Sequence, residues 1–265
     1  MYEFEYVRPK SVAEAAGFLA ANGDARLMSG GMTLLPTMKQ RLAQASHLVH
    51  VGPLGELKSI AREGDTLVVG SAATHDQVQE SEVVRAAIPA LAKLARGIGD
   101  PQVRYMGTIG GSIANNDPAA DYPAGVLGLG ATVVTHLRQI AADDYFQGLF
   151  TTALAEGEIV TAVRFPVPRR AGYVKFAHPA TGYAMSGVFV AETGSGVRVA
   201  VTGAGNGVFR WAEAEAALAK LMSPKALDGL ALDASHFSED IHATREYRAQ
   251  LCRVMAARAV NELLG

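Results

Sequence analysis

The alternation of apolar and polar positions predicts short helices and strands in turn along the N-terminal third. Ser11-Val-Ala-Glu14 has the spacing of a capping box and predicts an amphipathic helix that ends near Asn22-Gly23. Strands are predicted at 25–28 and 46–51. Residues 57–70 have the pattern of a hairpin that turns at Glu63-Gly64-Asp65.

The middle of the chain is predicted to be mainly helical. Thr74-His-Asp-Gln77 repeats the capping-box spacing, and a helical pattern follows from Ser81 to Gly97, broken or kinked at Pro89. A glycine-rich segment after residue 106 is expected to be a loop, and a short helix is expected from Tyr122 to Leu129.

The C-terminal half begins with strands predicted at 131–135 and 159–165. The cluster Pro166-Val-Pro-Arg-Arg170 is the best candidate for a domain boundary. Beyond it the pattern predicts strands at 173–176, 184–191 and 197–201 and helices at 212–221 and 244–263. The sequence therefore predicts an α+β protein in two parts, 1–168 and 169–265.

Composition excludes several function classes. The 265 residues are 49% hydrophobic, enough to fill a sizeable core, and the net charge is −2. Mixed charges with this balance give no electrostatic footprint for nucleic acid. No apolar run approaches the roughly 18 residues of a membrane span, and the first residues lack a signal-peptide pattern. We therefore expect a cytoplasmic protein without a membrane span.

The cysteine and histidine content argues against a metal site. The single cysteine, Cys252, excludes an intrachain disulfide or an all-cysteine cluster, and its helical context predicts a packing role. His47 and His50 are the closest pair of histidines, and a spacing of three along a strand points them to opposite faces. Any iron–sulfur cluster that serves this chain would lie on another polypeptide.

The candidate chemistry lies in two glycine-centred segments, Met28-Ser-Gly-Gly-Met-Thr-Leu-Leu-Pro-Thr-Met-Lys-Gln-Arg41 and Gly107-Thr-Ile-Gly-Gly-Ser-Ile-Ala-Asn-Asn-Asp-Pro-Ala-Ala-Asp121. Glycine pairs let the main chain approach a ligand closely, and successive N–H groups in such turns form anion-binding concavities. The first segment leads into a predicted helix with Pro36 in its first turn, which directs the positive end of that helix to the same place. Two such cradles favour a diphosphate, and hence a dinucleotide.

Both segments, in this order, resemble the FAD-binding motifs of the medium, flavoprotein subunits of molybdenum hydroxylases, the carbon monoxide dehydrogenase and xanthine dehydrogenase family. The resemblance extends through Phe4-x-Tyr6-x-Arg8-Pro9, Glu158-Ile-Val-Thr-Ala-Val-Arg-Phe-Pro166 and Asp240-Ile-His-Ala-Thr-Arg-Glu-Tyr-Arg248, so it covers nearly the whole chain. It implies a two-part FAD-binding domain of the PCMH (vanillyl-alcohol-oxidase-like) type at 1–168, with subdomains of about 1–55 and 56–168, followed by a smaller C-terminal α+β domain at 169–265.

The resemblance also implies the cofactor-binding residues of the first segment. Main-chain amides around the glycine pair would wrap the FAD diphosphate, at Ser29, Gly30, Gly31, Met32, Thr33 and Leu34. In related flavin folds a histidine just after such a pair can bond covalently to the flavin. Because Met32 stands here, non-covalent FAD is expected. A tight structural turn is the alternative for this segment.

In the second segment the resemblance implies that the hydroxyls of Thr108 and Ser112 bond to phosphate or ribitol oxygens of FAD. It also implies that the main chain approaches the cofactor closely at Gly111 and Asn115, and that Asp121 bonds to the adenosine ribose. The alternative for Asp121 is a helix N-cap before Tyr122-Pro123. Asp117 is expected to fix the loop through an Asx turn or to contact the ligand.

Near the proposed boundary the resemblance places Lys175 beside the pyrimidine carbonyls of the isoalloxazine ring and Tyr183 against its face. The alternatives are that Lys175 is a solvated strand residue and Tyr183 a packed one. The family often has arginine where Gly182 stands. Thr202-Gly-Ala-Gly-Asn-Gly207 invites a Rossmann interpretation, which fails because Val208 occupies the third glycine position, so a strand-to-helix turn is predicted.

The function that the resemblance implies is electron transfer within a multi-subunit oxidoreductase. A large subunit would carry the molybdenum cofactor, a small subunit two [2Fe–2S] clusters, and FAD on this chain would pass electrons to an external acceptor, in a dimer of heterotrimers. No catalytic residue is assigned. The alternatives are a stand-alone FAD-dependent oxidoreductase and a non-catalytic assembly scaffold that has kept the fold.

Overall fold

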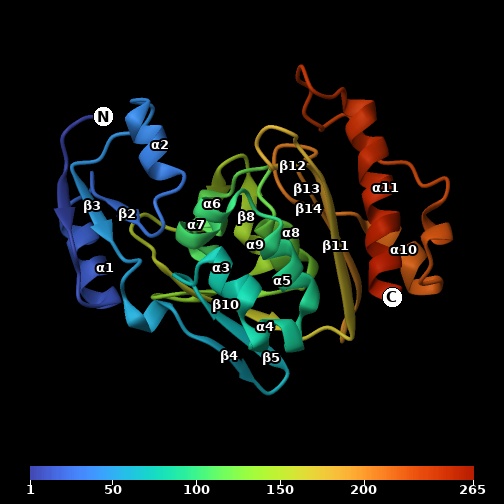
Figure 1. The fold of residues 1–265 in the computed structure, drawn as a ribbon, viewed down its shortest axis with the longest axis horizontal. Coiled ribbons are helices and arrows are strands. Elements are labelled where there is room, and N and C mark those ends of the chain that lie inside the picture. Colours follow the sequence, from blue (N-terminus) through green and yellow to red (C-terminus); the bar gives the residue numbers. More distant parts are fainter.

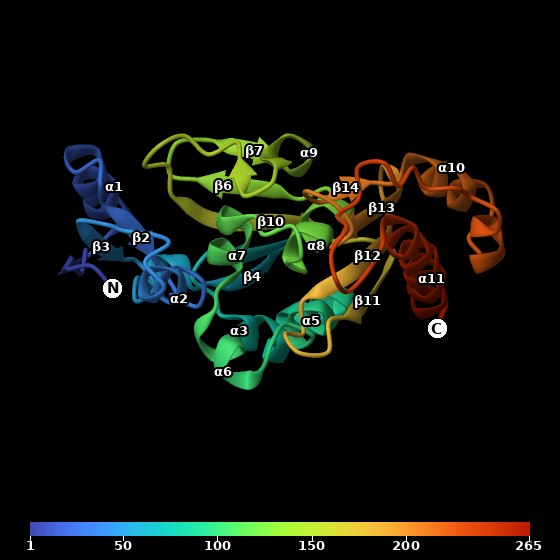
Figure 2. The same ribbon diagram turned by 90° about the horizontal axis from the view of Figure 1, so that it is seen from above.

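The computed structural model describes residues 1–265, which form three consecutive parts, each with its own sheet (Figure 1). In the two views the N-terminal and C-terminal parts lie at opposite ends of the molecule, with the helix-rich middle part between them (Figure 2). None of the helices is both long enough and apolar enough to cross a membrane.

The N-terminal part is a three-stranded parallel sheet with two α-helices and a 3-10 helix. Its strand order is β1-β3-β2. The Ser11 hydroxyl accepts a hydrogen bond from the main-chain N–H of Glu14, and this cap starts α1 at the predicted place. The elements are β1 (Glu5–Val7), α1 (Val12–Ala21), β2 (Arg26–Met28), α2 (Leu34–Lys39), β3 (His47–His50) and the 3-10 helix η1 (Gly55–Leu57).

The middle part contains a five-stranded sheet of order β4-β5-β10-β6-β7, antiparallel throughout. The predicted hairpin at Glu63-Gly64-Asp65 is confirmed, and Gly64 adopts a φ of +60°, a conformation that favours glycine. The strands are β4 (Ile60–Glu63), β5 (Thr66–Gly70), β6 (Thr132–Thr135), β7 (Gln139–Ala141) and β10 (Val160–Pro166); a small hairpin adds β8 (Phe146–Gly148) and β9 (Thr151–Thr152).

Seven helices accompany the middle sheet. Thr74 forms the predicted capping box with Gln77, and the helical pattern breaks at Ile88, directly before Pro89, as predicted. The helices are α3 (His75–Glu80), α4 (Glu82–Ala87), α5 (Pro89–Arg96), α6 (Pro101–Met106), α7 (Ile109–Asn115), α8 (Tyr122–Gly128) and α9 (Ala142–Tyr145).

The C-terminal part is an antiparallel sheet of order β11-β12-β13-β14, covered on one face by α10 and α11. The predicted turn after residue 202 is confirmed, although a short strand, β14, comes between it and the helix. The elements are β11 (Arg170–Ala177), β12 (Ala184–Thr193), β13 (Gly196–Thr202), β14 (Phe209–Arg210), α10 (Ala212–Lys220), the 3-10 helix η2 (Pro224–Leu227) and α11 (Arg245–Leu264).

Strand β12 joins the middle and C-terminal parts because both of its faces are buried. Val188 and Val190 pack into the core beneath α10 and α11, whereas Phe189 and Ala191 pack into the core of the middle part. Successive strand residues point to opposite faces, so a continuous apolar run serves both cores. Cys252 lies buried in the first of these cores, in agreement with its predicted packing role.

Candidate functional site

The first glycine segment forms the turn between β2 and α2. Gly31 has a φ of +71°, and a Cβ built on Gly30 would lie 1.9 Å from the main-chain oxygen of Met106. Position 31 requires glycine because of its positive φ, and position 30 requires glycine because another stretch of backbone approaches it closely. The turn is therefore packed directly against the start of the second segment.

The main-chain N–H groups of this turn have no partner within the protein. From Ser29 to Leu34 none of them donates a hydrogen bond, and the bonds of α2 begin only with the N–H of Leu35, which donates to the carbonyl of Gly31 at 3.0 Å. All six residues line one cavity. Thr33 and Leu34 lie at the start of α2, where a helix leaves its first N–H groups unpaired, and the turn before them adds further free donors. A row of free donors on residues that line a cavity is an anion-binding arrangement.

The second glycine segment is a helix and not the predicted loop. The Thr108 hydroxyl accepts a hydrogen bond from the N–H of Gly111 and caps α7, and the N–H of Ser112 donates to the carbonyl of Thr108. The N–H of Gly110 donates to the carbonyl of Ser71 at 2.9 Å. The prediction was wrong because two glycines lower intrinsic helix propensity, whereas close packing here requires one of them.

The two glycines of α7 have different surroundings. A Cβ on Gly110 would lie 2.5 Å from Cβ of Ser71, so this glycine is packed directly against Ser71, after β5. A Cβ on Gly111 would meet only the Thr108 hydroxyl, at 3.0 Å, and Gly111 lines the cavity. Gly110 therefore allows packing, and Gly111 opens the cavity wall.

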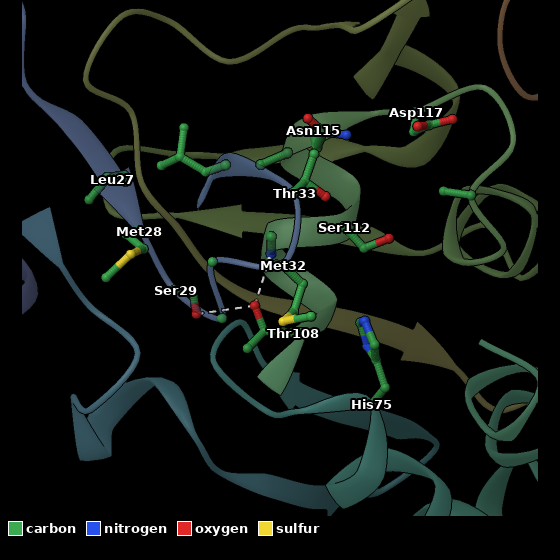
Figure 3. A pocket seen from close by; sticks show the side chains of 18 of the residues that line it. Leu27, Met28, Ser29, Met32, Thr33, His75, Thr108, Ser112, Asn115 and Asp117 are labelled. Carbon is green, nitrogen blue, oxygen red and sulfur yellow. Dashed lines mark hydrogen bonds between the residues drawn. The ribbon is translucent and has the colours of Figure 1, made fainter. Parts of the chain in front are cut away.

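The two segments meet through a direct side-chain contact. The Thr108 hydroxyl donates to the Ser29 hydroxyl at 3.1 Å, a contact between residues 79 positions apart in the sequence (Figure 3). The geometry gives one pocket with donors from β2–α2 on one wall and hydroxyls from α7 on the other.

The cavity has a volume of about 600 Å³, in the range of ligand pockets. Every cofactor-binding residue predicted from the sequence lines it except Lys175: Ser29, Gly30, Gly31, Met32, Thr33, Leu34, Thr108, Gly111, Ser112, Asn115, Asp121 and Tyr183. The free N–H row, the two glycine walls and the cavity together fit an extended dinucleotide with a diphosphate at its centre.

Lys175 lies behind the cavity wall, paired with Asp121. Its Nζ donates to Asp121 Oδ2 at 3.0 Å and to the carbonyl of Gly182 at 2.7 Å, while the Tyr173 hydroxyl donates to Asp121 Oδ1 at 2.6 Å. Complete burial raises the pKa of the Asp121 carboxyl, an effect opposed by the Lys175 ammonium and the Tyr173 hydroxyl. Asp121 occupies the N-cap position of α8, as the alternative from the sequence had it, but its side chain makes no capping hydrogen bond.

This ion pair conflicts with the assignments made from the sequence. Asp121 was expected at the adenosine ribose and Lys175 at the isoalloxazine ring, which are opposite ends of FAD. For an extended cofactor only one of these placements can hold, because the two side chains contact each other.

The loop after β11 carries Tyr183 to the mouth of the cavity. Tyr183 is 45% exposed, and the preceding Gly182 adopts a φ of +71°. Asp117, on the opposite loop, accepts a hydrogen bond from the N–H of Ala119 at 2.9 Å, which confirms the predicted Asx turn. Both residues line the cavity, so the loops that face each other there are locally fixed.

His75 is a cavity residue that the sequence did not single out. It follows the N-cap Thr74, and its ring rises from α3 toward the pocket (Figure 3). The capping-box pattern located the helix, but no local signal marks the first helical side chain as a pocket residue. No group of three or more His, Cys, Asp or Glu side chains is arranged to hold a metal ion.

Comparison with known proteins identifies the class of this site. Residues 2–168 match the family described as the FAD binding domain in molybdopterin dehydrogenase. The chain is 40% identical to the carbon monoxide dehydrogenase medium chain of Afipia carboxidovorans, over 97% of this chain and 95% of the relative. It is 35% identical to the nicotine 6-hydroxylase medium subunit of Paenarthrobacter nicotinovorans, over 97% and 96%.

Solved structures agree with the sequence comparison. A chain in the crystal structure of a cyanide-inactivated Cu,Mo-CO dehydrogenase superposes with a TM-score of 0.90 at 36% identity, covering 98% of this chain and 97% of that one. The chain belongs to the FAD-binding domain family of molybdopterin dehydrogenases, as the resemblance implied. It is thus a flavoprotein subunit of an oxidoreductase, and FAD is its cofactor.

Proposed function

We propose that this chain is the electron-transfer subunit of a molybdenum-containing hydroxylase, in which FAD takes electrons from [2Fe–2S] clusters of a partner subunit and passes them to an external acceptor. The observation that supports it best is the row of unpaired N–H groups from Ser29 to Leu34, opposite the hydroxyls of Thr108 and Ser112. Bound FAD supplies the redox chemistry, and the chain supplies binding and orientation.

In this proposal the diphosphate lies between the two glycine segments. The N–H groups of the first segment would donate to its oxygens, and the second segment would add hydroxyls and the close approach that Gly111 permits. Met32 lines the cavity at 37% exposure and has no nucleophilic atom for a flavin linkage of the histidyl kind. The FAD is therefore non-covalent.

The Asp121–Lys175 pair could lie at the adenosine ribose or at the isoalloxazine ring of FAD, and the position beside the isoalloxazine ring suits it better. Lys175 also holds the carbonyl of Gly182, directly before Tyr183, the residue expected to cover the ring face. One buried ion pair thus fixes the loop that carries the aromatic side chain. In this arrangement Lys175 acts through the loop and through Asp121, and not by direct contact with the ring carbonyls.

The proposed assembly follows from the relatives, which are named as medium chains or subunits. It contains a large molybdenum-cofactor subunit and a small [2Fe–2S] subunit, arranged as a dimer of heterotrimers. We also propose the domain division 1–168 and 169–265, because the family match ends at 168 and no sheet crosses that position. The cytoplasmic location stays a prediction from the sequence.

The test begins with an absorbance spectrum of the chain and whatever co-purifies with it, followed by acid release and chromatography of the pigment. Release of FAD, at about one per chain, supports the proposal. FMN, or a flavin retained after denaturation, contradicts the diphosphate placement or the role of Met32. No flavin in a reconstituted three-subunit complex would refute it, and NADH-dependent dye reduction by the chain alone would favour a stand-alone oxidoreductase.

A further inference from the structure

His75 is held rigidly at the wall of the cavity. Its main-chain N–H donates to the carbonyl of Gly107 at 2.9 Å, and its ring packs against that of Tyr122 with 5.3 Å between centroids. The residue is 5% exposed, and its remaining exposure is toward the cavity that it lines. The orientation of the imidazole is therefore fixed before any ligand binds.

Neither ring nitrogen of His75 has a hydrogen-bond partner within the protein. Nδ1 is buried and unpaired. Nε2 lies against the backbone of the second glycine segment, since a Cβ built on Gly107 would be 2.6 Å from it. Nδ1 has no accessible surface, so a ligand in the cavity can reach only Nε2, which has no partner and keeps accessible surface on a residue that lines the cavity.

The ring is neutral at pH 7. Burial, together with the smaller effect of the nearby Arg104 guanidinium, lowers the pKa of His75 to about 4. A neutral imidazole carries one N–H donor and one acceptor. It can therefore donate to an oxygen on a ligand without adding a charge to the pocket.

We propose that His75 is a cofactor-positioning residue, which donates a hydrogen bond from Nε2 of its imidazole to an oxygen in the diphosphate–ribityl stretch of FAD. The inference rests on the placement of FAD in this cavity, proposed above. It follows from the position of the ring beside Gly107 and Thr108, where the second segment meets Ser29 of the first. His75 thereby adds a side-chain donor to the main-chain donors of the opposite wall.

The test compares FAD affinity, measured by flavin fluorescence on titration of the full chain, among the wild type, His75→Leu and His75→Gln. His236→Leu is the control, because His236 is exposed and lies outside the cavity. His75→Leu should weaken binding about tenfold, equivalent to about 1.4 kcal/mol. His75→Gln, which keeps a neutral donor, should recover most of this affinity, and the control should bind as the wild type does.

A second measurement separates a contact with FAD from a structural role. Nitrogen-15 spectra of the histidine side chains are recorded for the wild type with and without FAD, and the His75 resonances are assigned by their loss in His75→Gln. FAD should shift the signal of one His75 nitrogen, while that of His236 stays unchanged. This measurement also carries the test if His75→Leu does not fold.

Two results would overturn the inference: FAD binding by His75→Leu within twofold of the wild type, or His75 nitrogen signals unchanged in FAD-loaded wild type. Either result would leave the FAD placement intact. Absence of FAD binding by the wild type, both alone and in the reconstituted complex, would instead refute the placement and this inference with it.

Discussion

The two glycine segments look alike in sequence and differ in what their backbones do. From Ser29 to Leu34 every main-chain N–H is free, and all six residues line the cavity, whereas the N–H groups of Ile109 to Ser112 all donate within the protein. The first segment is a donor surface. The second is a capped helix that offers hydroxyls and, at Gly111, an absent side chain.

This difference shows that a glycine pair does not by itself define a phosphate cradle. In the first segment Gly30 and Gly31 produce a turn whose donors cannot pair with each other, and in the second Gly110 brings α7 against Ser71. Accounting for each backbone donor separates the two cases. Binding free energy should therefore depend mainly on backbone geometry in the first segment and on side chains in the second.

The largest effect is expected at the end of the second segment, where Asp121 is fully enclosed. Lys175→Met should lower the free energy of unfolding by about 3–5 kcal/mol, because it leaves a buried carboxylate without its partner. Urea unfolding at pH 7 measures this loss. The double variant Asp121→Asn/Lys175→Met should regain most of it; a double variant as unstable as the single one would show that the ion pair is not the cause.

Gly30→Ala should be the next most damaging change, since the added methyl group would force apart the two backbones that pack together where the segments meet. The new Cβ would lie 1.9 Å from the main-chain oxygen of Met106, and backbone must move to admit it. We expect a loss of about 3 kcal/mol in thermal or urea unfolding.

Gly17→Ala in α1 is the matched control for this change. Nothing lies within 4 Å of its Cβ position, so alanine should be neutral or stabilise by up to about 1 kcal/mol. Equal effects at the two glycines would contradict the packing argument for Gly30.

The neutral state of His75 predicts how stability changes with pH. Its pKa is about 4 in the folded chain and ordinarily about 6.5, so below pH 6.5 the unfolded chain takes up a proton that the folded chain does not. The free energy of unfolding is therefore unaffected by His75 above pH 6.5 and decreases as the pH falls toward 4, by a total of roughly 3 kcal/mol.

His75→Gln should remove that dependence without affecting the other groups that titrate in the same range. Urea unfolding of both proteins from pH 7.5 to 4.5 gives the difference in slope. Parallel curves would show that His75 is protonated in the folded chain at the same pH as in the unfolded one.

Local features of the fold were predictable from the sequence. The caps at Ser11 and Thr74, the break before Pro89 and the hairpin at Gly64 each depend on residues within a few positions, so their patterns carry the information. Helix α7 was missed because its stability comes from packing against Ser71 and not from intrinsic propensity.

The candidate site was predictable only in part. The resemblance supplied the residues that line the cavity, but the contact between Asp121 and Lys175 joins residues 54 positions apart and depends on how β11 packs beside the second segment. Nothing in the sequence around His75 indicates that its ring lacks a partner. Tertiary contacts of this kind leave no periodic or spacing signal.

The smallest expected effect is that of Gly111→Ala, which tests the helical segment. Its Cβ would touch only the Thr108 hydroxyl, at 3.0 Å, and alanine favours a helix more than glycine does, so the apoprotein should unfold within about 1 kcal/mol of the wild type. The methyl group would occupy the cavity wall where we place the cofactor, and FAD should bind about tenfold more weakly, or by about 1.4 kcal/mol. Titration with FAD, alongside Gly110→Ala, separates the roles of the neighbours: Gly110→Ala should reduce the stability of the apoprotein, and Gly111→Ala only the affinity. Unchanged FAD affinity in Gly111→Ala would mean that the cofactor does not approach α7, and that the free donors of the first segment hold it alone.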